Sequence, residues 1–437
     1  MKNINLNGWG SNSKYSCKVF TPSSIDDLKT IKENFLIARG MGRSYGDSSY
    51  LTNATVSMKK FNKILFFDKI KGIIKCQSGC TINQILELII PNGWFFPVTP
   101  GTKFVSVGGM VASNVHGKNH HEVGSFNNFV NNFKIFISKK VELYCDKNTN
   151  SEIFYETFGA MGLTGIITEV EFSLKRIYSD KIIQRKYFSR NIEELIKLHL
   201  NLSDNEYLVS WINCAQNKIN KKSITFVGNH YKPDKISKIN FKKKYRISLP
   251  FFGVNFLTKS TIKILNYLYF KINKIFKNEI KIDILDYFYP LDKFHNWNNI
   301  YGKSGFFQIQ FVTPLKYSSK VLNEALDILI QKSDGSFITV IKKMKDEKIN
   351  RNSFTFLDDG FTFAVDLSYN KKNLKIYKEI EDLILKYHGK MNLTKDSLMN
   401  KDSFNKMYKK DDLSLIEKKY SSNDLKFLSE QFKRLKK

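Results

Sequence analysis

One short stretch, Pro97 to Phe126, constrains this chain more than any other segment. It reads PVTPGTKFVSVGGMVASNVHGKNHHEVGSF and combines a Pro-Gly turn, the Gly108-Gly109 pair, three of the chain's seven histidines and Lys118. Glycines of this kind let backbone N–H groups crowd around a ligand, because no Cβ blocks the approach. Polar ring and amine side chains follow at once. The stretch therefore predicts one wall of a cofactor site.

A second glycine-rich turn follows a buried-strand pattern near the N-terminus. Phe35–Arg39 (FLIAR) predicts a strand that runs directly into GMGRSYGD, residues Gly40–Asp47. A strand feeding such a turn is typical of phosphate-binding loops, but a Rossmann fingerprint needs G-x-G-x-x-G and then a helix. Here the third glycine, Gly46, comes one position late, and Ala54–Met58 alternates like a strand. The sequence therefore predicts nucleotide binding without a Rossmann fold.

The rest of the chain divides by its glycine content and by its pattern of predicted helices and strands. Capping residues and helical spacing predict a short helix capped by a serine after Pro22, and a second helix over Thr81–Ile90. Phe154–Phe172 predicts a short helix, a glycine-broken turn and an alternating strand. From about Tyr178 to about His388 glycines become fewer, and strands alternate with helices. This change indicates a second domain inside the chain.

Two amides share one side of a predicted strand. In GFFQIQF, Gly305–Phe311, the residues Gln308 and Gln310 lie two positions apart, so they point in the same direction. Amides are a poor choice for an apolar core unless they bond a ligand. The pair therefore predicts a polar strand face turned towards a binding site.

The chain is strongly basic. Its net charge of +29, from 70 basic and 41 acidic residues, admits nucleic acid, an anionic membrane surface or phosphorylated substrates as partners. Lysine greatly outnumbers arginine, which is the better residue for bidentate recognition of bases and phosphates. No recognised nucleic-acid motif accompanies the charge. We therefore expect no nucleic-acid partner.

Cysteine spacing and hydropathy indicate the compartment. The five cysteines are scattered, and although Cys76 and Cys80 lie four apart, no second pair completes a metal site. We therefore expect no metal and reduced thiols. The N-terminus lacks the apolar run of a signal peptide, and no stretch reaches ~18 uninterrupted apolar residues. These patterns predict a cytoplasmic protein without a transmembrane helix.

Basic and aromatic residues interleave over Phe241–Lys281, where ten lysines and arginines face a single acid, Glu279. Such a pattern is typical of an interfacial segment on an anionic bilayer. An ordinary helix packed on a sheet, with a solvated lysine face, gives the same pattern. The sequence leaves both interpretations open.

Three segments together resemble the FAD-linked oxidases of the vanillyl-alcohol oxidase type. Within that family the likeness is strongest to oxidases of polyprenylphosphoryl sugars. The likeness extends through PLD at Pro290–Asp292 and TKDS at Thr394–Ser397, so it covers most of the chain. The three segments are ARGMGRSYGD (Ala38–Asp47), PGTKFVSVGGMVASNVHGKNHHEVGSF (Pro100–Phe126) and GLTGIITEVEF (Gly162–Phe172).

The resemblance implies an α+β fold with a two-part, PCMH-type FAD-binding domain and an inserted antiparallel-sheet substrate domain. The expected boundaries are residues 1–177 for the FAD-binding domain, 178–388 for the substrate domain and 389–437 for a C-terminal return to the FAD-binding domain.

The resemblance also implies a cofactor, FAD, and the residues that hold it. Arg43 stands where covalent family members carry a flavin-linking histidine, so we expect non-covalent FAD. Residues Gly101 to Gly109 are expected to act as backbone donors, and His116 to lie beside the flavin. The full expected set is Arg39, Gly40, Gly42, Arg43, Ser44, Tyr45, Gly101, Ser106, Val107, Gly108, Gly109, Asn114, His116, Gly165 and Ile167.

The implied chemistry is oxidation of a sugar secondary alcohol, in which a hydride leaves carbon for the flavin while a base accepts the hydroxyl proton. A lysine serves as that base if burial and positive neighbours lower its pKa. Lys395, in TKDS, matches the family's catalytic lysine. The resemblance places Lys118, Gln310 and Tyr45 beside it, and gives Lys118 and Lys342 the substrate phosphate.

Three functions remain open at this level. The first is oxidation of the 2-hydroxyl of a polyprenylphosphoryl pentose, the oxidative half of an epimerisation in cell-surface polysaccharide synthesis. Its expected partners are a lipid-linked sugar phosphate, a short-chain dehydrogenase acting on the keto product, and the inner face of the cell membrane. The alternatives are a soluble alditol or sugar-lactone oxidase that uses oxygen, and a non-enzymatic basic binding protein. Two departures from the family pattern, Ala364 and Asn392, leave the sugar and the lipid open.

Overall fold

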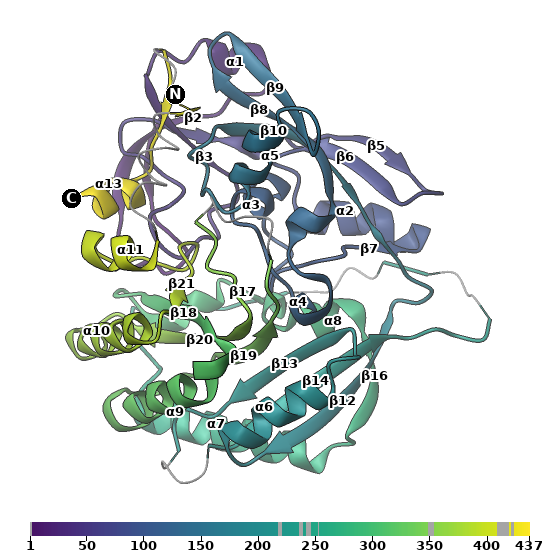
Figure 1. The fold of residues 1–437 in the computed structure, drawn as a ribbon, viewed down its shortest axis with the longest axis vertical. Coiled ribbons are helices and arrows are strands. Elements are labelled where there is room, and N and C mark those ends of the chain that lie inside the picture. The colour runs from purple at the N-terminus through teal and green to yellow at the C-terminus, as the bar shows by residue number, and fades with distance from the viewer. Residues whose placement is uncertain are drawn as a thin grey trace.

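The computed structural model describes residues 2–216, 221–235, 239–241, 246–251, 253–347, 354–408, 419–420 and 424–437. Figure 1 shows two halves packed on one another. The N-terminal strands and the C-terminal helices form one half, and a large sheet with its covering helices forms the other.

The first half begins with a five-stranded sheet in which the end of the chain pairs with its beginning. Near the C-terminus, β22 runs parallel to β3, so the last residues return to the N-terminal half (Figure 1). Because β3 ends at Arg39, the glycine-rich loop that follows begins at the edge of this sheet. The strand order is β1 (Lys2–Leu6), β2 (Tyr15–Phe20), β4 (Thr55–Ser57), β3 (Phe35–Arg39) and β22 (Lys426–Phe427).

A second five-stranded sheet in the same half is antiparallel throughout. Its order is β5 (Ile64–Asp68), β6 (Ile73–Gln77), β10 (Ile166–Ser173), β8 (Val130–Ser138) and β9 (Val141–Asp146). A short pair, β7 (Trp94–Phe95) with β11 (Lys175–Arg176), lies beside it. The helices of this half are α1 (Ile25–Lys29), α2 (Ile82–Ile89), α3 (Val107–Ala112), α4 (His120–Val123), α5 (Ser151–Thr157) and α13 (Glu430–Lys436).

The predicted helices of this half are confirmed, with the expected caps. Ser24 caps α1, and the Thr81 side chain accepts from the Gln84 N–H at the start of α2. Four apolar residues of α2 recur at helical spacing and are buried, because this face packs into the core of the first half. They are Ile82, Ile85, Leu86 and Ile89.

The second half is built on an eight-stranded antiparallel sheet. Its order is β16 (Glu279–Asp283), β12 (Lys181–Ser189), β14 (Ser223–His230), β13 (Tyr207–Ile212), β19 (Thr339–Met344), β20 (Gly360–Ser368), β18 (Phe306–Pro314) and β21 (Lys390–Met391). Its helices are α6 (Ile192–Asn201), α7 (Lys259–Ile275), α8 (Ile284–Phe288), α9 (Leu315–Lys332) and α10 (Lys371–Lys386), and α11 (Lys401–Met407) of the first half packs between α10 and α13. A parallel pair, β15 (Ile247–Ser248) with β17 (Phe294–His295), completes the second half.

Strand alternation gives the large sheet two chemically different faces. In β18, Phe307, Ile309 and Phe311 belong to the apolar cluster that includes residues of α9 and α10. Gln308 and Gln310, which alternate with them, line a cavity on the opposite face. The prediction that the two amides share a face turned towards a site is confirmed. The whole-chain pattern, mixed α/β with antiparallel sheets, also agrees with the expected fold class.

The basic-aromatic segment contains one long helix, α7, which begins with a capping box at Thr258. Its buried residues include Ile262 and Asn266, while several large apolar side chains remain exposed. Of the lysines expected to contribute to this segment, Lys242 to Lys244 lie outside the described residues.

All five cysteines are free and buried. Within the described ranges no helix has the length and hydropathy needed to cross a bilayer. The same ranges contain no group of three metal-ligating side chains.

Candidate active site

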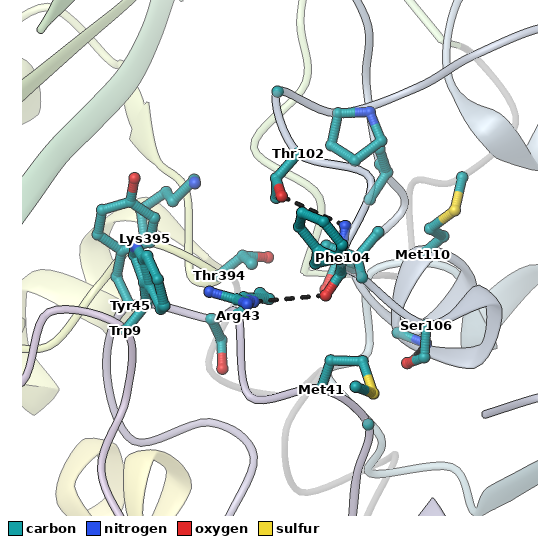
Figure 2. A pocket seen from close by; sticks show the side chains of 18 of the residues that line it. Trp9, Met41, Arg43, Tyr45, Thr102, Phe104, Ser106, Met110, Thr394 and Lys395 are labelled. Atoms are coloured by element: carbon teal, nitrogen blue, oxygen red, sulfur yellow. Dashed lines mark hydrogen bonds between the residues drawn. The ribbon is translucent and has the colours of Figure 1, made fainter. Parts of the chain in front are cut away.

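A cavity of about 450 Å³ lies between the two halves of the molecule. Figure 2 shows Lys395, Tyr45 and Trp9 on one side of it and Thr102, Phe104 and Ser106 on the other. Most residues expected from the sequence line this one cavity. They are Gly40, Gly42, Arg43, Ser44, Tyr45, Gly101, Ser106, Gly108, Gly109, His116, Lys118, Gly165, Ile167, Gln310, Lys342 and Lys395.

The loop after β3 offers backbone donors to the cavity. In the described chain, the N–H groups of Met41 to Ser44 donate to no other protein group. Gly42 has φ +65°, and a Cβ there would fall 2.3 Å from the Arg39 Nη2 atom. The positive φ and the lack of room for a Cβ therefore require glycine at this turn. Unpaired N–H groups at a cavity wall are what a diphosphate requires, so the loop fits the diphosphate of FAD.

The second glycine segment lies against the first. A Cβ on Gly40 would fall 2.0 Å from the Ser106 Oγ, so the close approach of the two segments requires glycine. The N–H groups here are already used: Val107 donates to Cys80 O at 2.9 Å, Gly108 to Ser78 O at 2.8 Å, and Gly109 to the Ser106 Oγ at 3.4 Å. The expectation that these three residues act as backbone donors to the cofactor needs correction. Gly108 and Gly109 instead present a wall without side chains.

Three residues of the expected cofactor set do not line the cavity but lie behind its glycine segments. The Arg39 guanidinium donates to the Ser49 Oγ at 2.9 Å and to the Asn7 carbonyl at 2.8 Å, which holds the glycine loop. Val107 is buried in the core. Asn114 is also buried, and its Oδ1 accepts from a backbone N–H at 3.3 Å. We therefore expect these three residues to support the site without touching the cofactor.

Arg43 lines the cavity between Trp9 and Phe104. Its guanidinium stacks over the Trp9 ring at 4.0 Å and its Nε donates to the Phe104 carbonyl at 3.4 Å, as the dashed line in Figure 2 shows. Burial lowers the pKa of this group, but an arginine stays charged at neutral pH. Arg43 therefore places a fixed positive charge beside the two glycine segments.

Three lysine amines reach the deep part of the cavity. Burial lowers the pKa of Lys118 to about 7, and burial together with the charges of Lys395 and Lys118 lowers the pKa of Lys342 to about 7. Lys118 donates to the backbone carbonyl of Tyr287, and its amine lies 4.2 Å from the centroid of the Tyr287 ring. Within the described residues, none of the three makes an ion pair with a carboxylate closer than 4 Å. The pocket therefore favours an anionic ligand.

A chain of amides fixes the orientation of Gln310. The Thr394 N–H donates to the Asn392 Oδ1 at 3.0 Å, so the Asn392 Nδ2 is the group that donates to the Gln310 Oε1, at 2.9 Å. The Gln310 Nε2 consequently points at the Thr362 Oγ1, 3.3 Å away, and at the His116 Nε2, 3.1 Å away. Gln310 is thus a donor to His116.

His116 links Gln310 to Lys342. Burial, with the nearby Lys342 charge, lowers the pKa of His116 well below its usual range, so the ring is neutral. With Nε2 accepting from Gln310, the ring proton resides on Nδ1, which lies 2.9 Å from the Lys342 Nζ. The Lys342 amine accepts this hydrogen bond when it is neutral, in agreement with its low pKa. The ring therefore couples the charge of Lys342 to the amide of Gln310.

A buried carboxylate stands behind the proposed base. Asp366 accepts from the Gln308 Nε2, which also lies 3.4 Å from the Tyr45 hydroxyl. Burial raises the pKa of Asp366, against a lowering effect of Gln308 and Lys395. Burial lowers the pKa of Lys395, against a raising effect of the Asp366 charge. The carboxylate therefore tunes how readily Lys395 gives up its proton.

Two acids near the site were missed by the sequence analysis. Asp366 lies in the apolar strand Phe361–Leu367, two residues after Ala364 and on its face, and an acid in such a strand was the available signal. Glu347 lies 3.4 Å from the His120 ring and accepts from the Ser125 N–H, which holds the histidine-rich turn in place. Nothing in the sequence around Glu347 marks this role, because the contact joins distant parts of the chain.

Comparisons with known proteins agree with this site. A family model described as an FAD binding domain matches residues 19–139, which include both glycine segments. The chain is 27% identical to decaprenylphosphoryl-β-D-ribose oxidase of Mycolicibacterium smegmatis over 98% of its own length and 97% of that protein. It is 32% identical to a D-lactate dehydrogenase of Anaerostipes hadrus over 29% of its length and 28% of that protein. It is 25% identical to the mitochondrial D-2-hydroxyglutarate dehydrogenase of Bos taurus over 29% of its length and 24% of that protein.

These matches set aside the hypothesis of a non-enzymatic binding protein. The flavin family, the full-length oxidase relative and the dehydrogenase relatives all point to the same chemistry, and the cavity has the glycine walls that this cofactor needs. The chain is therefore an FAD-linked oxidase, an oxidoreductase that acts on CH–OH groups.

Proposed function

We propose that this oxidase acts on the 2-hydroxyl of a polyprenylphosphoryl pentose, as the oxidative half of an epimerisation in cell-surface polysaccharide synthesis. The observation that carries the proposal is the group of three lysine amines, Lys118, Lys342 and Lys395, inside a cavity that also has a flavin wall. A neutral alditol offers no counter-charge to buried amines, whereas a bound phosphate favours their protonated forms. Full-length similarity to an oxidase of decaprenylphosphoryl-β-D-ribose supports the same substrate class.

The proposed division of labour follows from where the groups lie. FAD, when bound, supplies the hydride acceptor. Lys118 and Lys342 hold the substrate phosphate, which restores the charge that burial disfavours. Lys395, in its neutral form, takes the proton of the hydroxyl that is oxidised. Gln310, fixed by its hydrogen bonds, and Tyr45 orient the sugar beside that amine.

The same geometry supports a proposed division of the chain. Residues 178–388 supply the amide and lysine face from β18 and β19, and we propose that they form the substrate domain. Residues 1–177 and 389–437 supply the glycine walls and Lys395, and we propose that they form the two-part FAD-binding domain. The site then lies where the two parts meet.

The product of this step is a keto sugar that still carries its lipid phosphate. Restoring the hydroxyl with inverted configuration requires a separate reduction, and we propose a short-chain dehydrogenase as the partner that performs it. Because the substrate lipid resides in a membrane, we place the reaction at the inner face of the cell membrane.

The test measures flavin reduction in the absence of oxygen, and the loss of flavin absorbance is the signal. The panel holds a short-chain polyprenylphosphoryl pentose, the same pentose phosphate without lipid, the free pentose and free alditols. We expect rapid reduction only by compounds that carry the phosphate, with the lipid-linked sugar fastest. Equal or faster reduction by free alditols would overturn the proposal and favour a soluble alditol or sugar-lactone oxidase.

A further inference from the structure

Helix α7 presents a stripe of large apolar side chains to solvent. Ile264, Leu268 and Ile275 are exposed by 59%, 47% and 79%. At about 100° per residue, these three lie within roughly 40° of one another on the helix surface. Leu265 and Ile272, also exposed, widen the stripe to roughly 100° on the same count. An exposed apolar surface of this size indicates an interaction site.

This stripe is not the face that holds α7 on the protein. On the other side of the helix, Asn266 donates to Asn213 Oδ1 and to the Ser336 carbonyl, each at 3.0 Å. Tyr269 packs against the Trp211 ring at 4.9 Å. The helix is therefore anchored by a polar and aromatic face of its own, and the exposed stripe is free for another contact.

The charges of α7 select the kind of surface that fits it. The helix contains no aspartate or glutamate. Not all of its lysines border the apolar stripe: at about 100° per residue, Lys271 lies roughly 20° and Lys274 roughly 80° beyond Ile264, on one flank of the helix. From this flank, lysine side chains can reach anionic headgroups beside an inserted apolar stripe. The lysines within the helix are Lys259, Lys263, Lys271 and Lys274.

The start of α7 packs against a residue that lines the active-site cavity. Leu257 and Ile262, at the start of the helix, share a small apolar cluster with Tyr45, which lines the cavity. Just before them, Ile247 is 62% exposed and pairs in β15 with Phe294, another cavity residue. The buried start of α7 and the exposed β15–β17 pair therefore both adjoin residues of the cavity.

Helix α7 also lies on the face of the large sheet that carries the cavity. In β13, Val209 lines the cavity and Trp211, two residues later, contacts α7. Side chains two residues apart on a strand point to the same face of the sheet. Helix α7 and the cavity therefore lie on the same face of the large sheet.

We infer that α7, together with the exposed side chains of Ile247, Phe251, Val254 and Phe256, forms a docking surface for an anionic lipid bilayer. The apolar stripe enters the boundary between headgroups and acyl chains, and the lysines meet the anionic headgroups. This surface goes beyond the proposed function, because bilayer binding through α7 does not depend on which sugar is oxidised.

The test is co-sedimentation of the flavin-loaded protein with vesicles of phosphatidylcholine mixed with phosphatidylglycerol, and with vesicles of phosphatidylcholine alone. We expect binding to the anionic vesicles that falls as salt is added. The triple variant Ile264→Ser/Leu268→Ser/Ile275→Ser and the quadruple variant with glutamine at the four α7 lysines should each bind at least tenfold more weakly.

Matched controls carry the same changes elsewhere on the surface. Leu65→Ser/Phe66→Ser/Ile70→Ser removes three exposed apolar side chains from the other half of the molecule. A second control replaces four exposed lysines of that half with glutamine, at Lys59, Lys60, Lys63 and Lys69. Both controls should bind vesicles like the unmodified protein. Equal losses in the controls and the α7 variants would overturn the inference, because net charge and general stickiness would then explain binding.

A labelled position reports insertion even where a triple variant folds poorly. All five native cysteines are buried, so Leu268→Cys supplies an accessible thiol for an environment-sensitive dye, with Leu65→Cys as its control. Anionic vesicles should shift the emission of the dye at position 268 to the blue, and leave the dye at 65 unchanged. No shift at 268 would overturn the inference. A concentration-dependent shift without vesicles would do the same, since it would identify a second copy of this chain as the occupant.

The vesicles in these assays contain no lipid-linked sugar. Failure of the proposed substrate therefore leaves the binding result intact, and failure of binding leaves the flavin-reduction result intact.

Discussion

The amine of Lys395 lies 3.9 Å from the centroid of the Tyr45 ring, although the two residues belong to opposite ends of the chain. The backbone fixes this contact, because the Tyr45 N–H donates to the Thr394 carbonyl at 3.0 Å. A Cβ on the next residue, Gly46, would fall 2.1 Å from the Asp396 carbonyl oxygen. The first glycine loop and the TKDS turn are therefore locked together, and the proposed base is held at the flavin wall.

Replacing Lys395 with alanine should abolish turnover while leaving FAD bound. General-base catalysis contributes roughly 10²–10⁴-fold, so the rate of flavin reduction by substrate should fall by about that factor. The Lys401→Ala variant, at an exposed position of α11, is the control and should keep full activity. Rapid mixing without oxygen gives the rate, and flavin absorbance gives the occupancy. Unchanged reduction by Lys395→Ala would remove Lys395 from the mechanism.

Replacing Asp366 with asparagine should move the acidic limb of the pH–rate profile to lower pH. The Asp366 charge raises the pKa of Lys395, and the base works only when it is neutral. Without that charge, Lys395 loses its proton at a lower pH, so kcat/KM begins to rise earlier as pH increases. The control Asp334→Asn breaks an exposed ion pair with Lys372 and should leave the profile in place. A loss of activity with no shift of the limb would indicate a purely structural role for Asp366.

Binding of a phosphorylated ligand at pH 8 should take up protons. In the free protein, Lys118 and Lys342 have pKa values of about 7, so both are mostly neutral at this pH. A bound phosphate raises both pKa values towards the usual lysine range, so each lysine binds a proton. Calorimetry in buffers of different ionisation enthalpy measures the uptake, with a short-chain polyprenylphosphoryl pentose as ligand. Lys118→Met and Lys342→Met should each reduce it, and uptake that is zero at pH 8 and unaffected by either change would contradict the assignment.

Replacing Gly40 with alanine should weaken FAD binding. The new Cβ would lie 2.0 Å from the Ser106 Oγ, which forces the two glycine segments apart. Adding Ser106→Gly to this variant removes the clashing side chain and should restore part of the affinity. Titration of the apoprotein with FAD, followed by fluorescence, measures both. Full affinity in Gly40→Ala would show that the close approach of these segments is not needed for the cofactor.

FAD should leave the chain when the protein is denatured. Arg43 stands at the position expected for a flavin-linking residue, and a guanidinium stacked on Trp9 forms no such bond. Acid precipitation should therefore leave the flavin in the supernatant and give a polypeptide with the mass of the sequence alone. Flavin retained on the precipitated chain would contradict this expectation and direct attention to His116 and His120.

The sequence by itself determined the features that depend on neighbours along the chain. Period-two alternation placed Gln308 and Gln310 on one face, and that face lines the cavity. The capping residue and the apolar spacing of Thr81–Ile90 determined α2. The spacing of the glycines in Gly40–Asp47 excluded a Rossmann turn and indicated a phosphate loop, because the Rossmann fingerprint is defined by glycine spacing along the chain.

The tertiary structure decided which of these features act together. The hydrogen bond that already occupies the N–H group of Gly108 depends on Ser78, which no local pattern connects to it. Asp366 becomes a partner of Lys395 only because β20 lies next to β18 in the large sheet and the chain end returns to the same cavity.

The exposed stripe of α7 is the clearest case of a feature that only the tertiary structure decided. The sequence of Phe241–Lys281 fitted both a packed helix and an interfacial segment, since each needs a periodic apolar pattern. Packing resolved one part of the question: the face around Asn266 is buried, while the stripe containing Ile264 and Leu268 is left exposed. Which apolar face of a helix is buried depends on the surface it packs against, and that surface comes from distant parts of the chain.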